Sequence, residues 1–275
     1  MPTFTTTAPV SATVEVVLGD VRVTLSERDD TVVVVRPSDD SHDQDVKAAA
    51  QTRVEYAAGR LVVTSVKQRG LGLFGKPGSV DVTIALPTGS HLQGDASIAS
   101  FHCVGRLGEC RITTSVGDIQ LEHTGRLELS TGSGTVRVRA VDGSAVIKNS
   151  NGDCWVGDVT GDLRVKAANG DISVDRPHAD VTATTANGDV RVGALAAGSA
   201  SLKTGCGEIE IGVLAGHAAR LDVHTSFGRV HNRMSGAERP DPAEDTVDVR
   251  AHTSYGDIVI RPAHTPDSTI RTEQG

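Results

Sequence analysis

Residues 151–192 read NGDCWVGDVTGDLRVKAANGDISVDRPHADVTATTANGDVRV, and Asn-Gly-Asp occurs three times in this stretch. Its glycines, Gly152, Gly170 and Gly188, follow one another at intervals of 18 residues. Asn and Gly tolerate positive φ at little steric cost, so each Asn-Gly pair predicts a sharp turn between two strands. The stretch therefore consists of strand–turn–strand units of about 18 residues, and such a fixed period is the signature of a repeat protein.

The same unit extends in both directions from this stretch. Its anchor glycines are Gly117, Gly134, Gly152, Gly170, Gly188, Gly207, Gly228 and Gly256. The steps between them are 17, 18, 18, 18, 19, 21 and 28 residues. The first five steps are so similar that we interpret them as successive coils of one structure. The last and longest step contains a polar insertion, predicted at residues 232–246.

Side chains around each glycine alternate between apolar and polar. In the unit of Gly170, Ile172 and Val174 flank Ser173, and Val165 precedes Lys166. A period of two residues indicates a half-buried β-strand with one face inward. One unit cannot bury its inner face alone, but stacked units pair in parallel and form apolar columns. The predicted fold class is all-β, a parallel β-solenoid; a propeller would need a repeat of about 40 residues.

The N-terminal third is less regular but keeps the alternation in segments such as TVVVVRP (31–37) and SVDVTIALP (79–87). We expect residues 10–95 to form a β cap or irregular first coils, because terminal coils must cover an open sheet edge. Residues 96–261 are predicted to be the regular solenoid. Residues 1–9 and 262–275 are expected to be flexible.

Composition narrows the classes of function. The chain of 275 residues has a net charge of −8 and only 3% aromatic residues, which suits a thin core of small aliphatic side chains. No cluster of Lys and Arg supports binding to nucleic acid. The four cysteines have no zinc-type spacing. The N-terminus shows no basic and apolar leader pattern and no apolar run could span a bilayer, so we expect a cytoplasmic protein.

Three segments carry a resemblance to a known family: GDVRVTLSERDDTVVVV (19–35), SVDVTIALPTGS (79–90) and the serial NGD units. The chain resembles a bacterial putative-adhesin family of β-strand-repeat proteins of unknown function. The resemblance covers roughly residues 10–260 and implies a repeat fold rather than an activity. The length of the unit is also similar, more distantly, to that of bactofilins, which are β-solenoids that polymerise end to end.

Two features resemble contact surfaces. Trp155 is the only tryptophan, and the alternation of its strand predicts that its side chain points outward. Arg137 and Arg191 are predicted to point outward from the equivalent positions of nearby coils. An outward Trp beside Arg is a frequent binding anchor, although the ring could also lie against a loop. The Gly-rich segment 69–78 carries an apolar group that could dock a partner or cap the solenoid, namely Leu71, Leu73 and Phe74.

No combination of residues predicts catalysis. The sequence lacks the motifs typical of common enzymes, such as those around a catalytic serine or those that bind phosphate or a dinucleotide. It also predicts neither a cofactor nor a metal site. Turn acids such as Asp153 and Asp171 would stack along one corner, which suggests either calcium ligands or solvated carboxylates bonded to backbone N–H groups. We expect a non-catalytic scaffold for a protein partner; the alternatives are a self-assembling filament or oligomer and, less favoured, a carbohydrate-active β-helix enzyme.

Overall fold

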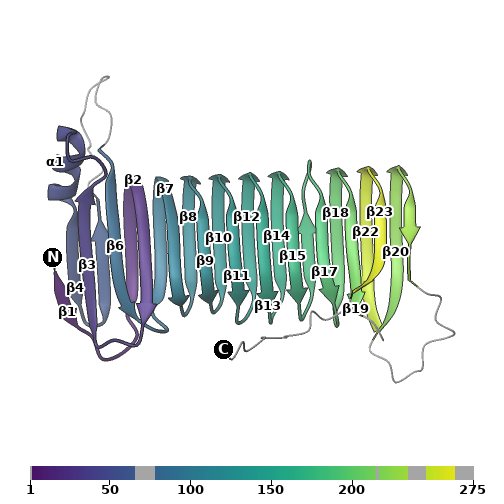
Figure 1. The fold of residues 1–275 in the computed structure, drawn as a ribbon, viewed down its shortest axis with the longest axis horizontal. Coiled ribbons are helices and arrows are strands. Elements are labelled where there is room, and N and C mark those ends of the chain that lie inside the picture. The colour runs from purple at the N-terminus through teal and green to yellow at the C-terminus, as the bar shows by residue number, and fades with distance from the viewer. Residues whose placement is uncertain (1, 66–77, 215–216, 235–245, 264–275) are drawn as a thin grey trace, which may run out of the picture.

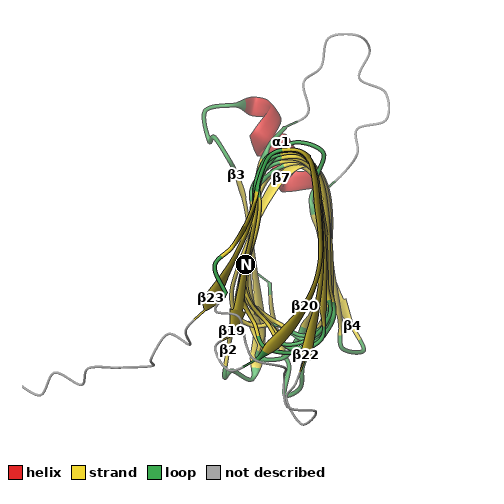
Figure 2. Cartoon of the chain, turned by 90° about the vertical axis from the view of Figure 1, so that its right-hand side faces the viewer, coloured by secondary structure: helices red, strands yellow, loops and turns green. Residues whose placement is uncertain are grey.

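The computed structural model describes residues 2–65, 78–214, 217–234 and 246–263. These residues form an elongated stack of two-stranded coils, called rungs below, that runs the length of the molecule (Figure 1). Viewed along its axis, the stack is a flattened ring with two facing β-sheets (Figure 2). The predicted fold class, an all-β parallel solenoid, is confirmed.

Each regular rung contributes one strand to each sheet. The strands of sheet 1 are β8 (Cys110–Val116), β10 (Leu127–Ser133), β12 (Ala145–Asn151), β14 (Leu163–Asn169), β16 (Val181–Thr184), β18 (Ser199–Cys206), β20 (Ala218–Phe227) and β22 (Thr246–Tyr255). The strands of sheet 2 are β9 (Ile119–Thr124), β11 (Val136–Val141), β13 (Cys154–Val159), β15 (Ile172–Pro177), β17 (Val190–Leu195), β19 (Ile209–Leu214), β21 (Val230–Asn232) and β23 (Ile258–Ala263).

The repeat length sets the register of both sheets. In sheet 1, Ile147 of β12 pairs in parallel with Leu129 on one side and with Val165 on the other. Because equivalent residues lie opposite one another, inward side chains stack in columns between the two sheets. Ile147 and Val165 are fully buried, and Leu129 is nearly so. The core is thus a thin layer of aliphatic side chains, which explains how the chain folds with so few aromatic rings.

The anchor glycines occupy the corner where each rung passes from sheet 1 to sheet 2. Seven of the eight have φ between +126° and +154°, and Gly228 is the exception. A Cβ added at Gly170 would lie 2.3 Å from the carbonyl oxygen of Gly152 in the adjacent rung. The corner therefore requires glycine for two reasons, its backbone conformation and the close approach of the neighbouring rung.

A second element of this corner was not predicted. Polar side chains three residues before seven of the eight glycines, all buried except the half-buried Thr225, donate hydrogen bonds to a corner carbonyl of the neighbouring rung. They are Thr114, Thr131, Asn149, Thr185, Thr204, Thr225 and Thr253. In six of these seven rungs the side chain is threonine. The sequence signal is Thr-x-x-Gly, and it repeats with the same period as the glycines.

Asn149 is the irregular member of this column. Its amide group donates to the carbonyl oxygens of Gly134 and Gly152, at 2.9 and 2.8 Å. Its buried Oδ1, however, has no hydrogen-bond partner among the described residues. Such an unpaired acceptor costs free energy because it has lost its water without replacement.

Replacing Asn149 by threonine should therefore stabilise the protein. The substitution supplies the same hydroxyl donor that the equivalent threonines of the other rungs use, and it removes the unpaired oxygen. We expect a gain of about 1 kcal/mol in the free energy of unfolding, which raises the melting temperature by roughly 2–4 °C. Thermal unfolding followed by circular dichroism measures the change. Ser150→Thr, at the exposed neighbouring position, is the matched control and should leave the melting temperature unchanged. A lower melting temperature for Asn149→Thr would contradict this interpretation of the column.

Two long strands join the N-terminal region to the regular rungs. β2 (Ser11–Ser26) and β7 (His91–Arg106) pair in parallel along most of their length and each passes through both sheets. β2 is followed outward by β5 (Arg60–Thr64) and β6 (Val80–Pro87), which pair with its first and second halves. The N-terminal third therefore continues the solenoid, in an order that differs from the order of the sequence.

Antiparallel strands close the N-terminal end. β3 (Asp30–Pro37) pairs with β6, β4 (Arg53–Ala57) pairs with β5, and β1 (Thr3–Thr5) pairs with β3. The helix α1 (Asp43–Gln51) lies at this end of the stack (Figure 1). Antiparallel pairing reverses the chain direction, so the parallel order of the rungs ends at β5 and β6.

The C-terminal rungs are also out of sequence order. β22 lies between β18 and β20, and β23 lies between β19 and β21. The interpretation of the units as successive coils is therefore wrong for the last two rungs, which do not stack in chain order. The long step from Gly228 to Gly256 joins the outermost rung to an inner one. Most of the predicted insertion, residues 235–245, lies outside the described residues.

Candidate interaction surface on sheet 2

One outward row of side chains runs along sheet 2 across successive rungs. The parallel register places its members opposite one another, in the order Gln120, Arg137, Trp155, Ser173, Arg191 and Glu210. The prediction that Trp155 faces outward next to Arg137 agrees with this register. Arg191 is two strands from Trp155, with Ser173 between them.

Trp155 is half-buried on the outer surface of β13. Its indole N–H donates a hydrogen bond to Oδ1 of Asp175, at 3.2 Å, on the neighbouring strand. The ring lies along its own strand, since a Cβ added at Gly157 would be 3.4 Å from the ring carbon Cη2. The indole is thus held in one orientation before any partner arrives, which lowers the entropy lost on binding.

A shallow hollow of about 440 Å³ adjoins Trp155 on its N-terminal side. Its outward lining side chains are His102, Val104, Gln120, Glu122, Arg137, Arg139 and Trp155. Val104 of β7 is 42% exposed, so an apolar side chain lines the hollow on the side away from Trp155. Arg139 forms an ion pair with Glu122, with 3.4 Å between Nη1 and Oε1, and closes one side. The hollow therefore offers an apolar floor with a rim of charged groups.

The two arginines predicted beside Trp155 are in different states. Arg191 pairs with Glu210, whose other carboxylate oxygen pairs with Arg261. Burial opposes ionisation of Glu210, but its hydrogen bonds to Arg261 and Arg191 outweigh that effect and lower its pKa. Arg137 takes part in no ion pair among the described residues. Arg137 is therefore the arginine whose donors are free to meet a partner, and Arg191 is engaged within the protein.

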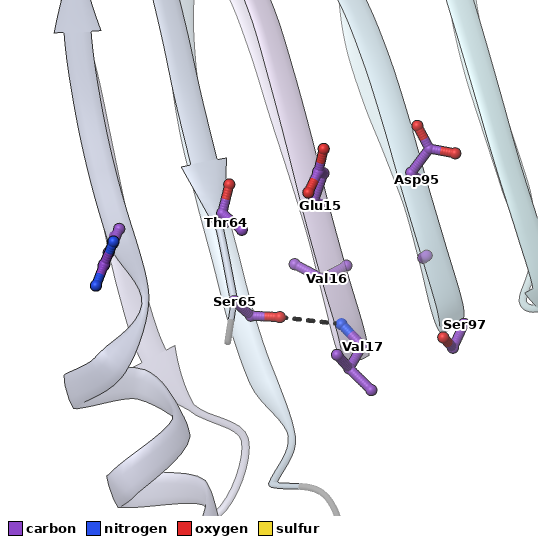
Figure 3. Close-up of a pocket in the computed structure, with 9 residues that line it drawn as sticks. Glu15, Val16, Val17, Thr64, Ser65, Asp95 and Ser97 are labelled. Atoms are coloured by element: carbon purple, nitrogen blue, oxygen red, sulfur yellow. Dashed lines mark hydrogen bonds between the residues drawn. The ribbon is translucent and has the colours of Figure 1, made fainter. Parts of the chain in front are cut away.

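A second hollow, of about 560 Å³, lies on sheet 1 near α1. Figure 3 shows Glu15 and Asp95 projecting from β2 and β7, where the two residues are paired in register. The hydroxyl of Ser65 accepts a hydrogen bond from the backbone N–H of Val17, at 3.0 Å, and so has a structural role. No histidine or cysteine lines this hollow, so it holds no Ser–His or Cys–His pair of the kind that acyl transfer uses.

The stacked turn acids are bonded to the backbone. Oδ1 of Asp153 accepts a hydrogen bond from the N–H of Asp171 at 2.9 Å, and Asp171 accepts one from Asp189 at 2.8 Å. Each carboxylate thus offsets the repulsion in the column by bonding the next turn. Among the residues that the structure describes, no group of three or more His, Cys, Asp or Glu side chains is placed to hold a metal ion.

Three of the four cysteines are part of the core. Burial raises the pKa of Cys103 to about 12 and that of Cys154 to about 11, and it also raises the pKa of Cys110. A thiol becomes a nucleophile or a metal ligand only as the thiolate. These three side chains therefore act as small apolar groups, whereas Cys206 is exposed.

Comparison with family models gives one match, to the family described as Toastrack DUF4097, over residues 11–267. The chain belongs to the Toastrack family. The match covers all of the rungs described above, from β2 to β23, including the two ends where rung order departs from chain order. The likeness to bactofilins stays a prediction.

Solved structures similar to this Toastrack chain are named as adhesins. A putative adhesin from Bacteroides fragilis is 16% identical, with 94% of this chain and 95% of that chain covered and a TM-score of 0.33. A putative adhesin from Parabacteroides merdae is 12% identical, with 94% of each chain covered and a TM-score of 0.35. No curated protein matches the chain.

The other predicted contact group, Leu71, Leu73 and Phe74, lies outside the described residues.

Within the described part of the Toastrack chain, no helix has the length and apolar character that crossing a membrane would need. His102, Val104 and Glu122, which line the same hollow as Trp155, were not predicted from the sequence. The repeat could have revealed Glu122, because a residue two positions after the outward-facing Gln120 points to the same side of the strand.

Proposed function

We propose that this protein is a non-catalytic, adhesin-like scaffold that presents the outer surface of sheet 2 to a protein partner. The observation that carries the proposal is the oriented Trp155 beside the unpaired Arg137 at the rim of an apolar hollow. Trp and Arg are the residues most enriched among those that dominate binding free energy at protein interfaces.

The solenoid supports this role because it makes the surface rigid. Each strand of sheet 2 has a parallel neighbour on both sides from β9 to β19, so the outward row is fixed by backbone hydrogen bonds. A rigid row loses little conformational entropy when a partner binds. The surface is also repetitive, since outward side chains recur at the spacing of adjacent strands, about 4.8 Å.

The chemistry of the two hollows supports the non-catalytic part of the proposal. The hollow on sheet 2 is lined by apolar side chains and by the ion-paired Arg139 and Glu122, and the hollow on sheet 1 is lined by carboxylates without a histidine or cysteine. Neither hollow offers an accessible Ser–His or Cys–His pair for acyl transfer, because Cys103 beside the sheet 2 hollow is buried in the core. Release of reducing ends from a panel of polysaccharides by the purified protein would contradict this part.

Replacing Trp155 by alanine should weaken partner binding by about tenfold to a hundredfold, as expected for an aromatic anchor worth roughly 2 kcal/mol. The partner is first captured from an extract of the source organism and then purified, and its dissociation constant is measured by calorimetry. Arg137→Glu should weaken binding in the same direction, because it places a negative charge where the free donors lie.

Tyr255→Ala is the matched control for Trp155→Ala. Tyr255 is an aromatic residue, 56% exposed, at the corner of a distant rung and away from the hollow. We expect wild-type affinity for this control. Equal affinities for wild type, Trp155→Ala and Arg137→Glu, with all variants folded, would show that the partner binds elsewhere.

A further inference from the structure

The two ends of the solenoid differ in how they finish the sheets. At the N-terminal end, the antiparallel strands β3 and β4 cover the outermost parallel rung. At the C-terminal end, β20 pairs with β22 on one side, and no strand of the described residues pairs with its other side. The same holds for β21, which pairs with β23 alone among the described strands.

The core is open at this C-terminal rung. Leu221 and Val223 of β20 face inward and are only half-buried. Their in-register neighbours on β22, Val249 and Ala251, are 1% and 3% exposed. An open row of backbone N–H and C=O groups above an exposed apolar layer is a template for pairing with another chain.

We infer that a second copy of this chain covers the open rung, with β20 of each copy paired antiparallel to β20 of the other. The N-terminal end is finished by β3 and β4, which run antiparallel to the rungs, so it offers no parallel rung that would continue the stack head to tail. A contact between two C-terminal ends uses the same strand in both copies and has two-fold symmetry. It closes on itself and gives a dimer rather than a filament.

The outward charges on β20 are complementary to themselves in this arrangement. Antiparallel pairing centred on Leu221 places Arg220 of each copy opposite Asp222 of the other copy. Leu221 then faces its own equivalent in the core layer, and Ala219 faces Val223. A shift of the centre to Asp222 would instead bring two aspartates together. Opposite charges on facing positions favour the first register, and like charges disfavour the second.

The side chains are free to make these contacts. Arg220 is 78% exposed and has a 3.4 Å ion pair with Asp248, whose side chain is itself 49% exposed. Exposed pairs of this kind are weak and exchange easily. The inference is independent of the Trp155 surface, which lies on sheet 2 at other rungs. If both hold, one dimer would display two copies of the hollow.

A charge-swap experiment tests the inference with the full chain. Sedimentation velocity over a dilution series should show a reversible monomer–dimer equilibrium for the wild type. Arg220→Asp and Asp222→Arg should each raise the dimer dissociation constant by about tenfold or more, since each puts two like-charge pairs in the interface. An equimolar mixture of the two variants should form a heterodimer with near wild-type affinity, because both facing pairs are then of opposite charge.

Each other outcome overturns the inference. A wild type that stays monomeric up to the highest concentrations would show that nothing of this chain covers the rung. Larger rods or filaments would show that the N-terminal end also associates. Two monomeric variants that fail to recover the dimer when mixed would show that β20 does not pair about Leu221. Thermal unfolding of each variant, expected to match the wild-type monomer, confirms that the substitutions act on association alone.

Discussion

Val165→Asp is expected to destabilise the protein by roughly 4 kcal/mol or more, which is enough to unfold many natural domains. Val165 is fully buried between Ile147 and Ala183 in the core column of sheet 1. An aspartate there would either carry an unpaired charge into an apolar layer or raise its pKa and remain a buried polar group. Urea unfolding followed by circular dichroism measures the loss.

Lys166→Asp is the matched control for this prediction, because it adds the same side chain one residue further along the strand. Lys166 is exposed and lies opposite Lys148 in register. Its replacement removes a like-charge pair, so we expect a change within about 0.5 kcal/mol of wild type. Similar losses for the two variants would contradict the inward and outward assignment of sheet 1.

Gly170→Ala is expected to cost about 3 kcal/mol or more in the free energy of unfolding. The residue has φ of +130°, and the added Cβ would lie 2.3 Å from the carbonyl oxygen of Gly152. The left-handed backbone alone costs an L-residue roughly 1–2 kcal/mol, and the clash has to be relieved by separating two hydrogen-bonded rungs. Urea unfolding measures the difference from wild type.

Gly59→Ala separates the two contributions. Gly59 has φ of +76°, and a Cβ added there meets no atom within 4 Å. It should therefore lose only the conformational part, about 1 kcal/mol. If Gly170→Ala were no more destabilising than Gly59→Ala, the close stacking of corner residues would not be what selects glycine at each rung.

The regular rungs could be predicted because their signals are local. Val165 and Lys166 differ in burial as their alternation indicates, and the 18-residue spacing of Gly152, Gly170 and Gly188 translates directly into parallel register. A strand period of two and a fixed repeat length leave little freedom once the rungs stack.

The order of the terminal rungs could not be predicted in this way. β20 and β22 have the same alternation, so either could pair with β18, and no local pattern distinguishes them. The choice depends on packing between segments far apart in the chain. The antiparallel cap is similar, since β3 reads as an ordinary apolar strand until β6 is placed beside it.

The candidate site was predictable only in part. The outward phase of Trp155 and its neighbour Arg137 follow from the repeat. The hydrogen bond to Asp175 and the Arg191–Glu210 ion pair depend on side-chain positions in adjacent rungs, which alternation does not specify. Residues 69–78 fall almost entirely in the segment 66–77 outside the described residues, so their predicted docking role stays a prediction.

Site-specific photo-crosslinking tests the central claim, that sheet 2 is the surface presented to a partner, most directly. A photoreactive phenylalanine analogue placed at Ser173, next to Trp155 on sheet 2, is compared with the same group at Lys166 on the outer surface of sheet 1. We expect a protein adduct from position 173 that disappears when Trp155→Ala is added, and none from position 166. An adduct from position 166 alone, or equal adducts from both positions, would contradict it.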